Sequence, residues 1–249
     1  MLHPDFLARP IAHRALHDIA AGRPENSASA VQAAVDAGYG IEIDLQLSKD
    51  GQAIVFHDYD LARLTHEKGP LATRTAAELS AIPLRHGTDT IPTLETVLSM
   101  IEGRVPLLIE IKDQSGILGP TNGALEQATA DCLAGYKGPV AVMSFNPHSV
   151  ARMADLSPNV PRGLTTCNFD ADDWPTIPAR IRETLRDIPD YARTGACFIS
   201  HQHDQLNAPR VADMRKDGAQ ILCWTIRTAD AERKAREIAD NITFEGYAA

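Results

Sequence analysis

The stretch Ile41–Asp58, IEIDLQLSKDGQAIVFHD, decides how the strands of this protein are counted. Two runs rich in apolar and β-branched residues flank Asp50-Gly51, a dipeptide typical of a two-residue hairpin turn. We therefore predict a strand over residues 41–47 and a return strand over residues 53–57. The return strand is expected to run antiparallel to the first, which sets it apart from the other strands of the chain.

Short apolar runs recur along the chain, with helical patterns between them. They predict nine strands, over residues 11–14, 41–47, 53–57, 106–112, 140–145, 162–167, 197–201, 221–226 and 241–246. Alternating strands and helices are typical of a parallel sheet. Without the return strand eight parallel strands remain, the number in a (β/α)8 TIM barrel. We expect an α/β fold, a TIM barrel with an extra β-hairpin strand after barrel strand 2, as a single domain over residues 1–249.

Composition and charge restrict the class of protein. The 249 residues include 24 Lys and Arg against 33 Asp and Glu, a formal net charge of -9. This balance argues against nucleic-acid binding and against attraction to anionic membranes. No apolar run approaches the roughly 20 residues of a membrane helix, so we expect no membrane insertion. The four cysteines are widely spaced and the N-terminus lacks a signal-peptide pattern, which together favour a cytoplasmic location.

The polar residues of the hairpin predict a cation site. With a turn at Asp50-Gly51, Asp44 is expected to lie directly opposite His57, with Glu42 on the same face. Two neighbouring carboxylates repel each other and resist ionising together. A divalent cation relieves that repulsion, and hard cations such as Mg²⁺ and Ca²⁺ prefer oxygen ligands. The alternative is a half-exposed strand whose polar side faces water.

Polar pairs at the ends of three successive barrel strands favour the active-site interpretation. His13-Arg14 closes the first strand, Glu42-x-Asp44 lies in the second, and Glu110-x-Lys112 ends the next. Catalytic residues of TIM barrels lie at the carboxyl ends of the strands. Surface strands would not be expected to repeat this placement.

An ordered set of motifs resembles the glycerophosphodiester phosphodiesterases of the phospholipase-C-like barrel superfamily. The motifs are His13-Arg14, Pro24-Glu25-Asn26, Glu42-x-Asp44, Lys49-Asp50-Gly51 and His57-Asp58, followed by IPTLETVL, IEIK, Ser144-Phe145 and Trp224-Thr225-Ile226. Each motif alone is weak, but their order is specific and covers nearly the whole chain. The resemblance implies metal-dependent hydrolysis of a small-molecule phosphodiester to glycerol 3-phosphate and an alcohol, within lipid and glycerol metabolism.

The resemblance also implies a role for each matching residue. These are His13 and His57 as general acid and base, Glu42, Asp44 and Glu110 as ligands of one divalent ion, Arg14 and Lys112 as phosphate-binding cations, and Glu25 and Trp224 as supporting residues. The ion is Mg²⁺, Ca²⁺ or Mn²⁺, since all three accept carboxylate ligands. The order of the two histidines and the oligomeric state are left open.

Other functions are compatible with the same predicted barrel. A lysophospholipase D, or a diesterase for a sugar or opine phosphodiester, would use the same residues on another substrate. A non-catalytic barrel would be expected to lack a histidine or carboxylate, and none is missing. The chain has Ala15 where the family usually has glycine; this methyl group could narrow the site or alter the substrate, but it removes no functional group. We expect residues 59–92 to shape specificity. His17, residues 201–204 and the acidic segment around Trp174 are expected to be surface or loop; the alternatives are that residues 201–204 extend the site or bind a second metal ion and that the segment around Trp174 is a substrate lid.

Overall fold

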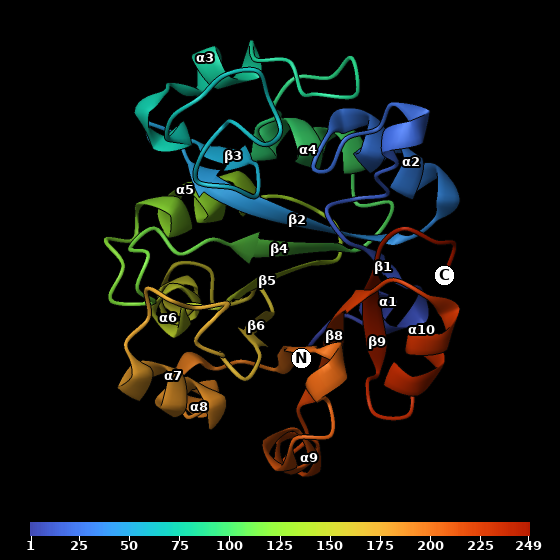
Figure 1. The fold of residues 1–249 in the computed structure, drawn as a ribbon, viewed down its shortest axis with the longest axis vertical. Helices are drawn as coiled ribbons and strands as arrows, with labels where there is room; N and C mark the ends of the chain where they lie inside the picture. The colour runs from blue at the N-terminus through green and yellow to red at the C-terminus, as the bar shows by residue number, and fades with distance from the viewer.

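A closed barrel of eight parallel strands forms the centre of the protein, as a computed structural model of residues 1–249 shows (Figure 1). The strands are β1 (Ile11–Ala12), β2 (Gly40–Leu47), β4 (Leu107–Ile111), β5 (Val140–Ser144), β6 (Arg162–Thr166), β7 (Phe198–Gln202), β8 (Gln220–Ile226) and β9 (Asn241–Phe244). They follow one another round the ring in chain order, and β9 pairs with β1, which pairs with β2. The predicted (β/α)8 barrel with an additional strand is confirmed.

Helices surround the strands on the outside of the barrel (Figure 1). They are α1 (Asp5–Ala8), α2 (Ala28–Ala37), α3 (Ala76–Ser80), α4 (Leu94–Ile101), α5 (Ala124–Leu133), α6 (Pro147–Leu156), α7 (Ala179–Arg186), α8 (Tyr191–Thr194), α9 (Pro209–Lys216) and α10 (Ala229–Ala235), with short 3₁₀ turns at Ile19–Ala21, Leu71–Thr73 and His203–Gln205. None of these helices combines the length and apolar character that crossing a membrane requires.

The ninth strand, β3 (Ala53–Val55), lies outside the ring and runs antiparallel to β2, as predicted, but the expected register is wrong by one residue. Leu45 pairs with Val55, so Phe56 rather than His57 lies opposite Asp44. In the hairpin only Gly51 has a positive φ, of 79°, whereas a two-residue type I′ turn needs positive φ at both central residues. The connection is instead a three-residue loop over residues 49–51 that ends on left-handed Gly51.

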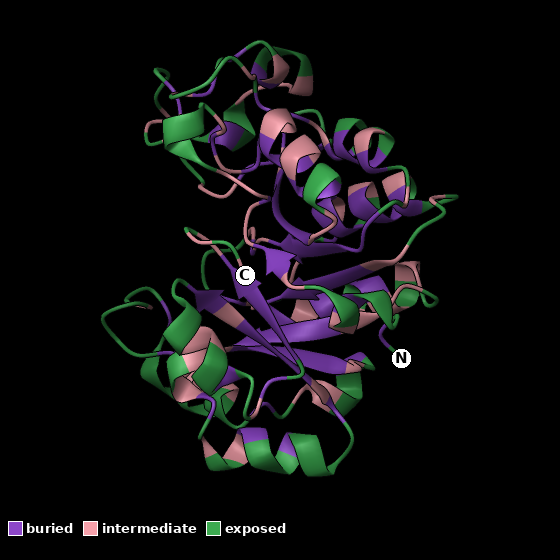
Figure 2. Cartoon of the chain, turned by 90° about the vertical axis from the view of Figure 1, so that its right-hand side faces the viewer, coloured by how far each residue is buried: buried purple, intermediate pink, exposed green.

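Alternate residues of the strands point to opposite sides, and the sequence differs between the two sides. On β2, Ile41, Ile43 and Leu45 face outward into the main hydrophobic core, which fills the space between strands and helices. Glu42 and Asp44 face into the barrel, and each is only 1% exposed. Figure 2 shows the strands mostly buried and the helices exposed on their outer surfaces. Polar side chains on an otherwise buried strand therefore end up inside the barrel, where water cannot solvate them freely.

The opposite, N-terminal end of the barrel is filled by apolar side chains. Phe6 of α1 packs with Leu108, Phe198 and other interior residues in a separate cluster. Gly163 on β6 makes room for Phe198, since a Cβ atom there would lie 2.3 Å from the Phe198 ring. The barrel is thus a packed core at one end and can hold a polar site only at the other.

We expect Gly163→Ala to destabilise the protein by about 1–3 kcal/mol, because the added methyl group overpacks the interior against Phe198. Urea unfolding measures this free energy. Gly119→Ala is the matched control, because a Cβ atom at Gly119 meets only ordinary contacts at 3.4 Å. Combining Gly163→Ala with Phe198→Leu should recover part of the loss. Equal stability of Gly163→Ala and the control would contradict the packing argument.

Candidate active site

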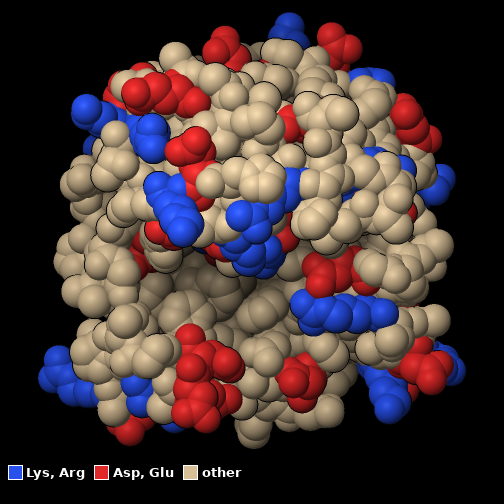
Figure 3. All heavy atoms as spheres, turned by 45° about the horizontal axis from the view of Figure 1, so that its top comes forward, with Lys and Arg blue, Asp and Glu red and all other residues tan.

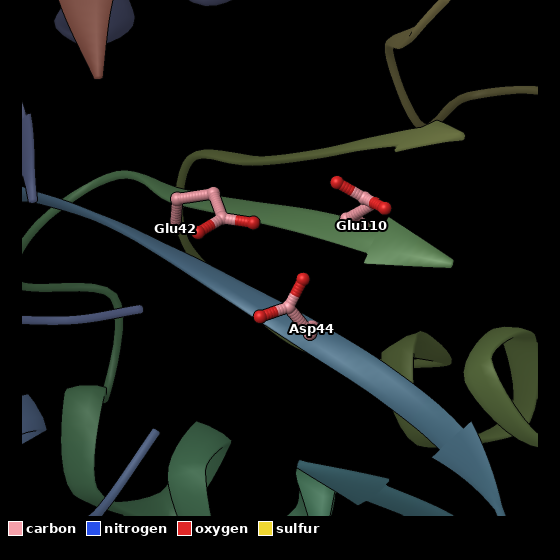
Figure 4. Close-up of side chains that lie close together, drawn as sticks. All are labelled: Glu42, Asp44 and Glu110. Atoms are coloured by element: carbon pink, nitrogen blue, oxygen red, sulfur yellow. The ribbon is translucent and has the colours of Figure 1, made fainter. Parts of the chain in front are cut away.

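Three carboxylates from two neighbouring strands meet inside the barrel. Glu42 and Asp44 belong to β2, and Glu110 on β4 pairs in register with Asp44. Figure 4 shows the three side chains turned toward one another, and one oxygen of each lies within 4.8 Å of the others. All three are buried. The parallel register of β2 and β4 places them together, because both strands present the same face to the barrel interior.

Two cations of the protein compensate part of this negative charge. The Lys112 ammonium lies 2.7 Å from both Asp44 and Glu110, and the Arg14 guanidinium lies 3.6 Å from Asp44. Burial would raise the pKa of Asp44, but Lys112, His57 and Arg14 outweigh it and hold that pKa well below its usual range. Glu42 is compensated less: burial and the neighbouring carboxylates raise its pKa well above the ordinary value. When ionised, Glu42 therefore lacks a full partner among the cations of the protein.

The end of β1 turns sharply and aims its polar residues at the carboxylates. The strand ends at Ala12 rather than at Arg14, and Arg14 and Ala15 have positive φ of 52° and 64°. This turn lets the backbone N–H of Arg14 donate to Glu42 over 2.9 Å. The Ala15 methyl group packs in the main core and lines neither of the two cavities at the carboxyl end of the barrel that are described below. Of the two possible effects of Ala15, narrowing of the site is therefore not seen, and the left-handed backbone explains why glycine suits this position.

His13 is held by a carboxylate that follows the last strand. Its Nδ1 lies 2.5 Å from Glu245, which also approaches His17 Nε2 at 3.5 Å and accepts from Arg227 over 2.7 Å. Burial lowers the pKa of His13, and the hydrogen bond to Glu245 only partly opposes this. Because Glu245 accepts at Nδ1, the Nε2 atom is free to act. His17, expected to be an isolated loop residue, instead contributes to this cluster.

His57 is held in the same way and connects to a chain of alternating charges. Its Nδ1 lies 2.7 Å from Asp58, and Arg63 donates to both oxygens of Asp58 over 2.6 and 2.8 Å. Arg63 also donates to both oxygens of Glu25 over 2.8 and 2.9 Å. Glu25 in turn accepts from Arg14 over 2.8 Å. Each ionised side chain in this series of ion pairs has an opposite charge on either side. The series therefore fixes the positions of the side chains between His57 and the three carboxylates.

These side chains line two adjoining cavities at the carboxyl end of the barrel. The inner chamber, of about 150 Å³, contains His13, Arg14 and Glu42, whereas the outer cavity, of about 650 Å³, opens toward solvent. Both cavities are lined by His57, Glu110, Lys112, Phe145 and Trp224. Figure 3 shows a hollow on the face that it presents, with uncharged walls and both acidic and basic side chains at its border. The shared residues make one continuous site with a polar interior and a wider mouth.

Aromatic side chains form one wall of the mouth. Trp174 packs against Phe145 with ring centroids 4.9 Å apart, and Trp224 contacts Phe145 edge-on at 5.5 Å. Trp174 comes from the acidic segment expected to be a solvated loop, and it lines the outer cavity. His201, by contrast, hydrogen-bonds Thr166 and lines neither chamber. The structure thus brings together all nine predicted site residues and adds Trp174.

Sequence reasoning missed two positioning groups, Glu245 and Arg63. Glu245 directly follows β9, so its place at the carboxyl end of a barrel strand was an available signal. Arg63 lies in the long connection between β3 and α4, and no local pattern distinguishes it from a surface arginine. Only the folded position of that connection brings it between Glu25 and Asp58.

The chemistry of the carboxylate group fits a divalent metal ion. Glu42, Asp44 and Glu110 supply only oxygen donors, which hard cations such as Mg²⁺ and Ca²⁺ prefer. They are buried and mutually close, and their combined charge exceeds that of the nearest protein cations. These three residues could therefore hold one divalent ion.

Comparison with known proteins points to one family. The chain matches the Glycerophosphoryl diester phosphodiesterase family over residues 13–241. It is 26% identical to a glycerophosphodiester phosphodiesterase of Caldanaerobacter subterraneus, over 88% of this chain and 87% of that protein. It is 32% identical to one from Bacillus altitudinis, over 63% and 68%. Its fold superposes with a TM-score of 0.77 and 22% identity on an Oleispira antarctica phosphodiesterase solved with the product sn-glycerol-3-phosphate, covering 95% and 92% of the two chains.

We expect millimolar Mg²⁺, Ca²⁺ or Mn²⁺ to raise the melting temperature by several degrees, because an ion that binds only the folded protein stabilises it. Glu42→Gln should abolish this shift by removing a ligand. Without metal the variant should melt at or above the wild-type temperature, since a buried negative charge is gone. Exposed Glu95→Gln is the control and should keep the full shift. An undiminished shift in Glu42→Gln would contradict the assignment of the site.

Proposed function

The chain belongs to the glycerophosphoryl diester phosphodiesterase family, and we propose that it hydrolyses glycerophosphodiesters to glycerol 3-phosphate and an alcohol with one divalent metal ion. One observation carries this proposal: three buried carboxylates lie together beside a chamber that is lined by two histidines, each paired at Nδ1 with an acidic residue. Family membership supports hydrolysis of a phosphodiester. The single domain over residues 1–249 and the cytoplasmic location remain predictions.

The charges of the site suit an anionic diester. We assign Glu42, Asp44 and Glu110 as metal ligands; the bound ion would act as a Lewis acid toward the phosphate oxygens. Arg14 and Lys112 line the chamber and offer donors to the same phosphate. Glu25 holds Arg14 in place from the side away from the chamber. Together these groups stabilise negative charge as it develops on the phosphoryl oxygens.

The two histidines suit proton transfer in opposite directions. Each has Nδ1 occupied by a carboxylate, so each presents Nε2 for reaction. One removes a proton from the attacking hydroxyl group, and the other donates a proton to the leaving alcohol oxygen. The attacker is the glycerol 2-hydroxyl, giving a cyclic phosphate that water then opens. We assign His13 and His57 as this pair without fixing their order.

The outer cavity suits the leaving alcohol, because it adjoins His57 and opens outward. Trp224 lines both cavities and would form the wall between glycerol and alcohol. The apolar side chains of Leu118, Trp174 and Ile177 favour a second candidate, a lysophospholipase D whose lipid substrate places an apolar part in this cavity. Both candidates use the same catalytic residues and differ in the substrate.

The direct test is release of glycerol 3-phosphate from glycerophosphocholine and glycerophosphoethanolamine with Mg²⁺, Ca²⁺, Mn²⁺ or EDTA. We expect release with at least one metal and none with EDTA, because the carboxylates need the ion to bind the phosphate. Lysophosphatidylcholine, assayed in parallel for choline release, separates the second candidate. A folded, metal-binding protein without activity on any glycerophosphodiester would overturn the proposal.

Replacing His13 or His57 with Ala should reduce kcat by about 10²–10⁴, the usual contribution of a general acid or base. Glu245→Gln should act through His13 and lower kcat by about 10–100-fold with little change in KM. His203→Ala is the control, because His203 lines a different cavity and should keep full activity. Steady-state kinetics measure these values. Activity of either His→Ala variant within a few-fold of wild type would contradict the scheme.

A further inference from the structure

Two buried threonine hydroxyl groups in the inner chamber have no partner in the protein. Thr165 on β6 is 2% exposed and Thr243 on β9 is 1% exposed. Both line the inner chamber, and neither Oγ1 atom makes a hydrogen bond within the chain. Buried polar groups in proteins are nearly always hydrogen-bonded, because leaving them unpaired destabilises the fold. Because both threonines also line the chamber, a ligand that enters it can supply the missing partner.

The two threonines flank the carboxylates from opposite sides of the barrel. In the ring, β6 is separated from β4 by β5, and β9 is separated from β2 by β1. Met143 on β5 also lines the chamber, between the Thr165 side and the Glu110 side. The chamber thus has carboxylates on one wall, single hydroxyl groups on two others, and an apolar thioether among them.

We propose that Thr165 and Thr243 bind the hydroxyl groups of the glycerol moiety of the substrate. This inference rests on the function proposed above. In the proposed complex the phosphate faces Arg14 and Lys112, whereas neutral hydroxyl groups are the natural partners of an alcohol, because each can donate and accept a hydrogen bond. The methyl and thioether groups beside them suit the carbon chain of glycerol. The threonines then determine that the chamber takes glycerol phosphate rather than another alkyl phosphate.

Ser200 on β7 provides a matched control within the same barrel. Its side chain is 0% exposed, and its Oγ atom also lacks a partner in the protein. Unlike the two threonines, Ser200 lines neither chamber. Ser200 pairs in register with Thr165 but is not part of the chamber lining, so we expect that its hydroxyl group does not contribute to binding.

The test compares binding of two ligands, sn-glycerol 3-phosphate and propyl phosphate, which has the same three carbons but no hydroxyl groups. Isothermal titration calorimetry is done with the metal ion that supports turnover. We expect Thr165→Val and Thr243→Val each to weaken binding of glycerol 3-phosphate about three- to tenfold, the effect of losing one neutral hydrogen bond. Binding of propyl phosphate and the melting temperature should stay at or above wild-type values. Ser200→Ala should bind both ligands as wild type does.

Three outcomes would overturn the inference. Unchanged binding of glycerol 3-phosphate by the two valine variants would show that the threonine hydroxyl groups bind ordered water or no partner at all. An equal loss for both ligands would show that the threonines bind phosphate or maintain the shape of the site. If the wild-type protein turns over glycerophosphodiesters in either case, the proposed function stands and only this inference fails. A wild-type protein with neither turnover nor binding of glycerol 3-phosphate would overturn both.

Discussion

The repulsion between three buried carboxylates is the constraint on which the rest of the site depends. Glu42, Asp44 and Glu110 lie together away from water, where like charges interact strongly. Lys112 and Arg14 lie beside them, and Arg14 is itself fixed by Glu25. Positive and negative side chains thus alternate with increasing distance from the three carboxylates. This arrangement determines the geometry at the carboxyl end of the barrel, because a buried charge without an opposite partner would destabilise the fold.

The shortness of β1 makes the position of His57 possible. β1 covers only the first two residues of the β2 edge, and β3 takes the other part of that edge at Leu45–Leu47. The chain then leaves β3 at the mouth of the barrel, where His57 and Asp58 follow at once. The connection beyond, over residues 59–92, packs around a small hydrophobic cluster of its own. That cluster holds Arg63 where it can join Asp58 to Glu25, so the loop supports the site from outside.

The barrel interior changes from apolar to polar along its axis, and this gradient places the chemistry. Phe198 and its neighbours fill the N-terminal end, while Thr165 and Thr243 line the chamber farther along their strands. Beyond them, aromatic side chains from separate loops meet at the mouth. In the proposed reaction, binding, charge stabilisation and release of the alcohol would use successive levels of one cavity.

The sequence by itself determined the strand count, the barrel and the carboxylate group, because alternation, turn residues and spacing along a strand are local properties. It could not determine the hairpin register, because a two-residue loop and a three-residue loop are both compatible with Asp50-Gly51. In the folded protein only Gly51 has a positive φ, as the three-residue loop requires. It also could not find Arg63, or show that the Ala15 methyl group faces the core. Those features depend on contacts between segments far apart in the chain, which only the tertiary structure decides.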